Sequence, residues 1–139
     1  MSNQNISNKI LYWYDNNKRN LPWRKKTSIK NREYFTLVSE FMLQQTQVAT
    51  VVPYFTNFIK IFPNLKFLAN ANEKEVLKNW EGLGYYSRAR NLKKTAVNLL
   101  INFKGRLPKD IEKLKSLPGI GDYTASAISA IAFNKPIIP

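Results

Sequence analysis

The sequence contains no cysteine and no histidine among its 139 residues. Their absence excludes a disulfide bond, a metal site built from these two side chains, and catalysis by a thiolate or an imidazole within the chain. A long hydrophobic run is also missing from the first residues, MSNQNISNKILYWYDNNKR, so we expect neither a signal peptide nor a membrane span there. The default expectation is a cytoplasmic protein without a membrane partner.

Acidic residues are scarce: nine aspartates and glutamates stand against 22 lysines and arginines, a formal net charge of +13. Such an excess favours a polyanionic partner, most often nucleic acid. The alternative is a protein whose many lysines and asparagines only reflect an AT-rich genome. Hydrophobic residues make up 44% of the chain, which is enough for one globular domain with a core.

Alternating, strand-like patterns are also missing, because the apolar residues recur with helical spacing almost throughout. The sequence therefore predicts an all-α fold. Pro53 falls within one helix, where we expect a kink or a place near the helix start. Asn72, followed by Glu75, predicts a capped helix start. The expected helices span residues 6–16, 34–41, 47–61, 72–80, 92–103, 109–117 and 122–133.

A short turn with the sequence LPGIG, residues 117–121, separates the last two helices. Gly119 and Gly121 permit positive φ angles and a close approach to the backbone. The exposed N–H groups and the N-terminus of the next helix together form an anion site, and Ile120 holds the turn between the helices. This pattern is typical of a helix-hairpin-helix that binds a DNA phosphate without reading sequence. Ordinary packing of two helices is the alternative.

One carboxylate falls among apolar residues. On a helix, Glu40 lies beside Leu37 and Leu43, whereas an exposed glutamate usually has polar neighbours. Desolvation at such a position raises the pKa of a carboxyl group, which suits a general acid near neutral pH. The alternative is an ordinary glutamate at the boundary of the core.

Two polar stretches are candidates for contact with bases. Gln44 and Gln45 lie where one helix ends and the next begins, and amides suit base edges because they donate and accept hydrogen bonds without charge. Residues 82–90, GLGYYSRAR, are expected to form a loop in which Tyr85 stacks on or wedges between bases and Arg88 neutralises a phosphate. The alternatives are plain turn chemistry for the glutamines and a tyrosine packed on the core.

Four strings occur in a fixed order: LPW, SEFMLQQTQVATVVPYF, WEGLGYYSRARNL and LPGIGDYTASAI. Together they resemble the N-terminal part of the A/G-specific adenine DNA glycosylases, the MutY family, over nearly all of residues 6–139. The family belongs to the helix-hairpin-helix glycosylase superfamily. The resemblance implies a six-helix barrel lobe over residues 28–139, with the helix-hairpin-helix at 113–133. It assigns residues 1–27, a helix and a basic loop, to a second, iron–sulfur lobe.

The resemblance also implies a reaction, the hydrolytic excision of adenine mispaired with 8-oxoguanine or guanine after the base is flipped out of double-stranded DNA. Endonuclease III relatives carry a lysine where this chain has Tyr123, which implies a monofunctional glycosylase. The resemblance further implies a monomer located in the bacterial cytoplasm, at the nucleoid. The resemblance implies that Glu40 protonates the adenine and that Gln45 and Tyr85 intercalate, with Gln44 close by. Trp23 and Arg24 are implied to line the base pocket. The remaining implied DNA-binding residues are Arg88, Gly119, Ile120, Gly121 and Tyr123.

Several parts of the family pattern are not in this sequence. The family places a catalytic aspartate shortly after the position of Pro139, so we expect the chain to be truncated before it. The family also holds a [4Fe–4S] cluster with four cysteines and carries a further C-terminal domain, and neither has a counterpart here. Two alternatives stay open: a pyrimidine- or thymine-specific glycosylase of the same superfamily, and a non-catalytic DNA-binding remnant.

Overall fold

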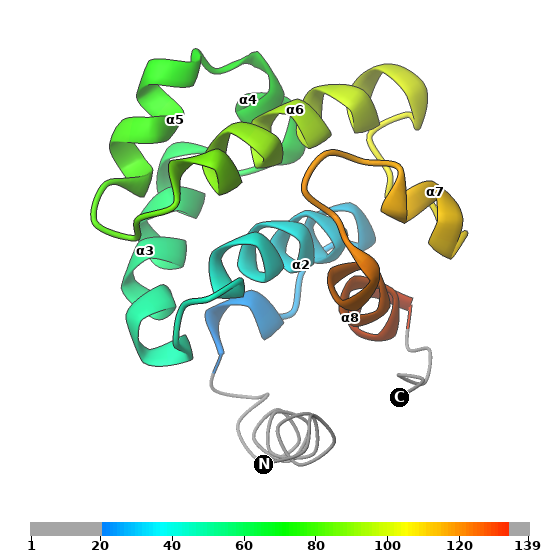
Figure 1. The fold of residues 1–139 in the computed structure, drawn as a ribbon, viewed down its shortest axis with the longest axis horizontal. Coiled ribbons are helices and arrows are strands. Elements are labelled where there is room, and N and C mark those ends of the chain that lie inside the picture. Colours follow the sequence, from blue (N-terminus) through cyan, green and yellow to red (C-terminus); the bar gives the residue numbers. More distant parts are fainter. Residues whose placement is uncertain (1–20, 134–139) are drawn as a thin grey trace.

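The computed structural model describes residues 21–133, and every regular element in this range is helical (Figure 1). The all-α prediction is therefore confirmed, while the helix expected over residues 6–16 lies outside the described residues. No helix within 21–133 is both long enough and apolar enough to cross a membrane. The elements are η2 (Pro22–Arg24), α2 (Ile29–Leu43), α3 (Val48–Ile61), α4 (Leu65–Asn70), α5 (Glu73–Trp80), α6 (Tyr86–Asn102), α7 (Ile111–Lys115) and α8 (Asp122–Phe133).

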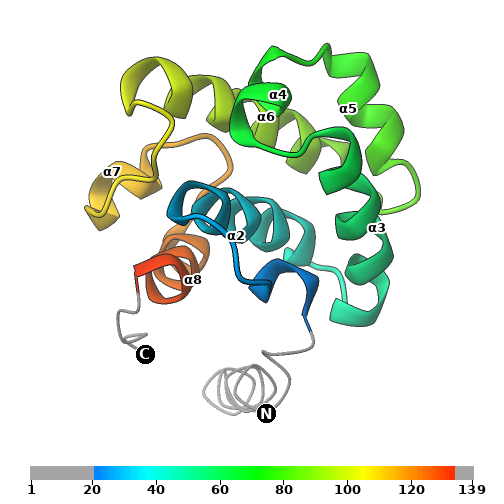
Figure 2. The same cartoon turned by 180° about the vertical axis from the view of Figure 1, so that it is seen from behind.

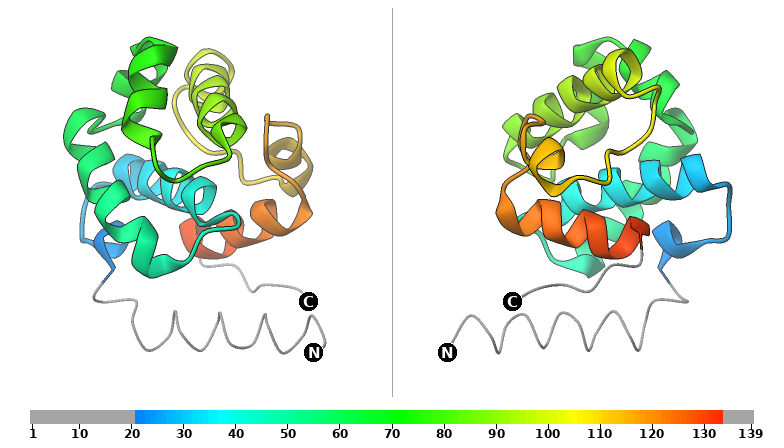
Figure 3. Two further views of the ribbon diagram at one scale, coloured as in Figure 1. Left: turned by 60° about the vertical axis from the view of Figure 1, so that its left-hand side comes forward. Right: turned by 90° about the vertical axis from the view of Figure 1, so that its right-hand side faces the viewer.

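Helix α2 is the centre of the described fold. It contacts α3, α6, α8 and η2, and the two views of Figure 3 place α6 on one side of it and α8 on the other. Seen from behind, η2 lies beside α2 and α3 (Figure 2). Leu37, Val38 and Ser39 are successive residues, so they point in different directions around the helix axis, and all three are buried. A helix that is covered on several sides in this way holds any polar group on it in a fixed place.

Side-chain caps begin several of the helices. Ser28 accepts a hydrogen bond from the backbone N–H of Asn31 at the start of α2. Asn72 accepts one from the N–H of Glu75 at 2.7 Å, which confirms the capped start predicted for α5. Each such cap stabilises a helix by about 0.5–2 kcal/mol.

Aromatic rings form much of the core around α3. Phe58 meets Trp80 edge-on with ring centroids 6.1 Å apart, and Phe55 meets Trp23 in the same way at 5.3 Å. The Tyr34 hydroxyl donates a 2.6 Å hydrogen bond to the carbonyl of Phe62, and burial raises the pKa of Tyr34. The C-terminal end of α3 is thereby fixed to α2.

Two local features differ from the sequence prediction. Helix α4 was not predicted; it has six residues, so it is too short to show a period, and Asn64 caps it. Helix α6 begins at Tyr86 rather than near residue 92, so the expected loop over 82–90 is wrong in its second half. Pro53 lies inside α3, as expected, and leaves one intrahelical hydrogen bond unmade, while the expected kink stays a prediction.

Candidate functional site

Glu40 is buried on α2 with 6% of its surface exposed, as its apolar neighbours indicated. Tyr123, in the first turn of α8, interacts electrostatically with Glu40. Burial raises the pKa of Tyr123, and the negative charge of Glu40 raises it further. Tyr123 is itself 58% exposed, so the neighbourhood of the buried carboxylate extends to the surface there. The raised pKa expected for Glu40 itself stays a prediction.

The turn at residues 117–121, called the hairpin turn below, has its carbonyl groups held from the inside. Thr95 donates a 2.8 Å hydrogen bond to the carbonyl of Pro118. In a trans peptide the C=O and the following N–H point in opposite directions, so the N–H of Gly119 points away from Thr95 and α6. Ile120 is buried in the core, as expected for the side chain that holds the turn. The turn therefore presents backbone rather than side chains on its outer side.

The two glycines of the hairpin turn are glycine for different reasons. Gly119 has φ +79°, and a Cβ there would come within 2.9 Å of Phe41 Cε1 and Asn91 Cβ, so the fold itself requires glycine. Gly121 has no positive φ, and a Cβ there would meet nothing within 4 Å. Folding does not require glycine at 121, but the missing side chain leaves the backbone there open to close approach.

An exposed ion pair closes the connection between α7 and α8. Lys115 Nζ lies 2.8 Å from Asp122 Oδ1, and this hydrogen bond is the main cause that raises the pKa of Lys115. A pair this exposed contributes little to stability. It does join the last residue of α7 to the first residue of α8 across the hairpin turn.

Two segments, residues 44–47 and 82–85, are called the polar loops below, and the first of them contacts the hairpin turn through Gln44. Each contains one residue with a left-handed backbone that is not glycine: Gln45 with φ +62° and Tyr85 with φ +49°. Such angles are sparsely populated by residues with a side chain and cluster at functional sites. Both side chains are exposed, Tyr85 by 63%. The polar loops thus present the two side chains that the sequence assigned to intercalation.

Gln44 connects a polar loop to the hairpin turn. Its Nε2 atom donates hydrogen bonds of 3.2 Å to the carbonyl of Gly119 and to Oγ1 of Thr124. Its amide nitrogen is therefore already engaged within the protein, although direct contact with DNA stays a prediction. Thr95 and Thr124 were not predicted as partners of the turn, because nothing in the sequence around a helical hydroxyl group indicates an acceptor far away in the chain.

Arg88 is placed differently from its predicted role. It was expected in a loop, in contact with phosphate, but it lies in the first turn of α6 with only 6% of its surface exposed. Its guanidinium lies over the rings of Trp80 and Tyr85, and burial lowers its pKa. It donates hydrogen bonds to five backbone carbonyls, those of Phe41, Met42, Gln44, Leu83 and Gly84. The guanidinium is thus engaged with protein loops, and its contact with a phosphate stays a prediction.

Residues 38–139 match a protein family described as HhH-GPD superfamily base excision DNA repair protein. The chain belongs to this superfamily. The match covers the C-terminal part of α2 and everything that follows it, including Glu40, both polar loops and the hairpin turn. The resemblance inferred from the motifs is confirmed.

Curated relatives of this HhH-GPD chain are named adenine DNA glycosylase. The relative from Rattus norvegicus is 48% identical over 131 residues, which are 91% of this chain and 25% of the relative. A relative from Buchnera aphidicola is 48% identical over 126 residues, which are 90% of this chain and 35% of the relative. The chain thus spans about a quarter to a third of the length of these relatives.

The solved structure of a thermostable thymine-DNA glycosylase is similar to this HhH-GPD chain with a TM-score of 0.74. It shares 26% sequence identity, and the alignment covers 95% of this chain and 59% of that one. The all-α architecture derived above is therefore the architecture of known HhH-GPD glycosylases.

Trp23 and Arg24 were expected to line a base pocket. Trp23 is buried, edge-on to Phe55, and its indole N–H has no hydrogen-bond partner among residues 21–133. Arg24 is half-buried beside it on η2. The structure thus places both residues against α2 and α3, and their contact with a base stays a prediction.

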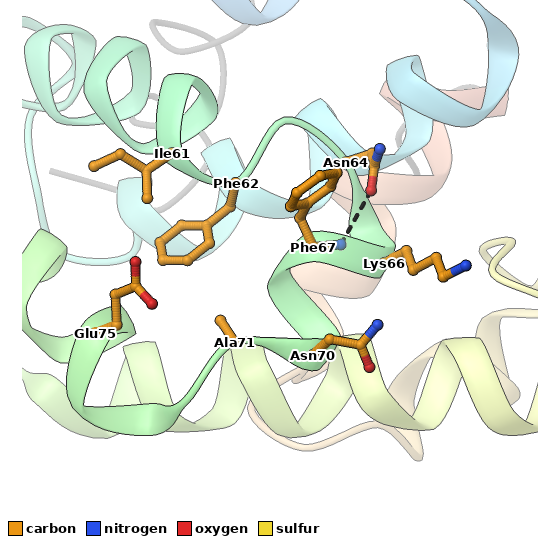
Figure 4. Close-up of a pocket in the computed structure, with 8 residues that line it drawn as sticks. All are labelled: Ile61, Phe62, Asn64, Lys66, Phe67, Asn70, Ala71 and Glu75. Atoms are coloured by element: carbon orange, nitrogen blue, oxygen red, sulfur yellow. Dashed lines mark hydrogen bonds between the residues drawn. The ribbon is translucent and has the colours of Figure 1, made fainter.

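A hollow of about 490 Å³ lies away from these residues, at the C-terminal end of α3 (Figure 4). Phe62 and Phe67 line it together with Ala71, and Asn64 at its edge caps α4. Helix α3 separates this hollow from the polar loop at residues 44–47 by about 20 Å. The hollow is therefore not part of the candidate site. Phe67 is 57% exposed, so its substitution is a matched control for substitution of the exposed ring of Tyr85.

Proposed function

We propose that the gene product containing this chain is an adenine DNA glycosylase, which removes adenine mispaired with 8-oxoguanine or guanine from double-stranded DNA. The observation that carries the proposal is the buried carboxylate of Glu40 beside Tyr123, with the hairpin turn and both polar loops on adjoining elements. The 48% identity to relatives named adenine DNA glycosylase supports adenine as the base. On this proposal the protein works as a monomer on the chromosome in the bacterial cytoplasm.

Each part of the site has one role in the proposed reaction. The N–H of Gly119 and the N-terminus of α8 bind a backbone phosphate, which fixes the position of the protein on the duplex without reading sequence. Gln45 and Tyr85 enter the base stack and fill the space that the flipped adenine leaves. The adenine then lies near Glu40, on the surface that opens at Tyr123.

The chemical step is the hydrolysis of the bond between the sugar C1′ and the adenine nitrogen. The bonding electrons leave with the base, and Glu40 in its acid form donates a proton to the adenine ring, which makes the base a better leaving group. Water adds a hydroxyl group to C1′, and its remaining proton restores the acid form of Glu40. We assign the second carboxylate, which stabilises the positive sugar, to a residue beyond Pro139, following the family resemblance.

Tyr123 accounts for the proposed lack of strand cleavage. A phenol does not form a Schiff base with the sugar, so the reaction ends with release of the base. Incubation of the gene product with substrate and borohydride is expected to trap no major protein–DNA adduct, and a trapped adduct as the main product would contradict this step.

An iron–sulfur cluster does not fit the residues of this chain, because none of the 139 residues is a cysteine. Residues 28–139 are proposed as the six-helix barrel lobe, and residues 1–27 as the first part of a second lobe.

The experiment that tests the proposal replaces Glu40 by glutamine in the complete gene product. Adenine release from a duplex with adenine opposite 8-oxoguanine is expected to fall by about 10²–10⁴, because an amide cannot donate the proton. Unchanged release would overturn the assignment of Glu40. A duplex with a T:G mispair is the specificity arm: thymine release by the wild-type protein would favour a thymine-specific enzyme, the activity named for the similar solved structure.

Glu33→Gln is the matched control, because Glu33 is also a buried carboxylate on α2. It is bound by Arg106, with Nη2 2.5 Å from Oε2, and by the backbone N–H of Leu107 at 2.9 Å. We expect Glu33→Gln to lower the free energy of unfolding by about 1–3 kcal/mol. It should leave adenine release per folded molecule unchanged.

A further inference from the structure

The hydrogen bonds of Arg88 fall at two particular peptide groups. One guanidinium nitrogen, Nη1, donates to the carbonyl of Gln44, and the other, Nη2, donates to the carbonyl of Gly84 at 3.2 Å. These carbonyls belong to the peptide groups immediately before Gln45 and Tyr85. The orientation of a peptide plane, relative to the residue that follows it, is the φ angle of that residue. One side chain therefore holds the φ angles of both left-handed residues.

Left-handed backbone at a residue with a side chain persists only when its surroundings determine it. Arg88 supplies such surroundings for both polar loops, since its remaining bonds fix it to the C-terminal end of α2 and to Leu83. The ring of Tyr85 lies over the guanidinium itself, 5.4 Å from its carbon. The rigid, planar guanidinium suits this task because its two terminal nitrogens, Nη1 and Nη2, reach the two loops at once, whereas a lysine would reach only one of the two peptide groups at a time.

The contacts also continue toward the hairpin turn. Gln44 receives the hydrogen bond of Arg88 on its backbone carbonyl, and its side chain donates to the carbonyl of Gly119 and to Thr124. A continuous chain of contacts therefore runs from Tyr85 through Arg88 and Gln44 to the hairpin turn.

We propose that Arg88 is a positioning residue that sets Gln45 and Tyr85 at a fixed distance from one another and from the hairpin turn, so that the two side chains enter DNA as one unit. The insertion into DNA rests on the proposed function. The fixed geometry of the two loops does not, and it can be measured in the protein without DNA.

The first experiment compares Arg88→Lys with wild type by hydrogen exchange in the complete gene product, without DNA. We expect backbone exchange to rise by about tenfold in both polar loops together, because local opening of both depends on the same side chain. Arg106→Lys is the control, since Arg106 also joins distant elements, through Glu33, but lies on other loops. It should accelerate exchange around residues 103–107 and leave the polar loops unchanged. Unchanged exchange in the polar loops of Arg88→Lys, or a rise in only one of them, would overturn the proposal.

The second experiment measures insertion rather than catalysis. The fluorescence of 2-aminopurine placed opposite 8-oxoguanine reports base flipping. Gln45→Ala and Tyr85→Ala are measured singly and together, first in the wild-type protein and then in Arg88→Lys. In wild type the effects of the two alanine substitutions should be non-additive, because loss of either side chain already disrupts the unit. In Arg88→Lys each alanine substitution should have only a small further effect, because the unit is already disrupted. Binding to undamaged duplex should stay within about threefold for Arg88→Lys, since the hairpin turn is retained. Additive effects in wild type would overturn the insertion as one unit.

The two proposals fail in different ways. If the wild-type protein releases no adenine yet Arg88→Lys loosens both polar loops, the proposed reaction is wrong and the positioning role stands. If adenine is released normally and exchange is unchanged in Arg88→Lys, the reverse holds.

Discussion

The hairpin turn and the polar loops both depend on left-handed backbone, but they differ in the residue types that adopt it. The hairpin turn has glycine at its left-handed position, Gly119, and leaves its outer side bare at Gly121. The polar loops also have left-handed residues with side chains, Gln45 and Tyr85, besides Gly82 and Gly84, although glycine would be less strained at positions 45 and 85. On the proposed function, the difference indicates which part of each segment would face DNA: the backbone in the turn, and the side chains in the loops.

The largest expected effect separates the two glycines of the hairpin turn. Gly119→Ala should lower the free energy of unfolding by about 2–4 kcal/mol, because a Cβ would crowd Phe41 and Asn91 and the φ angle is unfavourable for alanine. Gly121→Ala should change it by less than about 0.5 kcal/mol. Urea unfolding of both variants measures the difference, and equal losses of stability would remove the distinction between them.

The next effect tests the side chains of the polar loops. Tyr85→Ala should weaken binding to a duplex with adenine opposite 8-oxoguanine by about 1–3 kcal/mol, the range for loss of one stacked aromatic ring. Phe67→Ala removes a similarly exposed ring from α4 and should leave affinity unchanged. Fluorescence anisotropy with labelled duplex gives both constants. A similar loss in Phe67→Ala would show that the measurement reports general stability rather than the loop.

A smaller effect tests the backbone of the turn. Gly121→Val should weaken DNA binding by about tenfold, because its side chain covers the exposed amides and one phosphate contact is lost. The loss should be the same for matched and mismatched duplexes. A variant that binds only one mismatch more weakly would show instead that the turn reads the lesion.

The smallest effect concerns the strain in the polar loops. Gln45→Asn should raise the free energy of unfolding by about 0.5 kcal/mol, because asparagine tolerates left-handed backbone better than glutamine. Lys104→Asn is the control, at another left-handed residue with φ +56°, after the end of α6. Both variants should be slightly more stable in thermal unfolding, but only Gln45→Asn should bind damaged DNA more weakly. Equal DNA binding by both would indicate that the glutamine side chain is not inserted.

The sequence was sufficient where the signal is local. The hairpin turn follows from its own five residues, the cap at Asn72 from one asparagine, and the burial of Glu40 from Leu37 and Leu43 beside it. The match to the HhH-GPD superfamily confirms that these motifs belong together.

The role of Arg88 could not be predicted, because an arginine beside a glycine-rich segment is usually exposed. Its acceptors on α2 lie more than 40 residues away in the sequence, and nothing local indicates them. The start of α6 was placed too late for a related reason: Tyr86 and Arg88 were interpreted as loop chemistry, whereas both lie in the first turn of a helix in which Arg88 packs on Trp80 and bonds to α2.

The way the hairpin turn is anchored has a consequence for ionic strength. Thr95 and Gln44 hold its carbonyls inward, so what it offers a phosphate is an uncharged amide and the end of a helix. Contacts of this kind release few counterions, unlike those of lysine and arginine side chains. As salt concentration rises, attraction by the 22 basic residues should fade first, and the turn should supply a growing share of whatever hold on DNA persists.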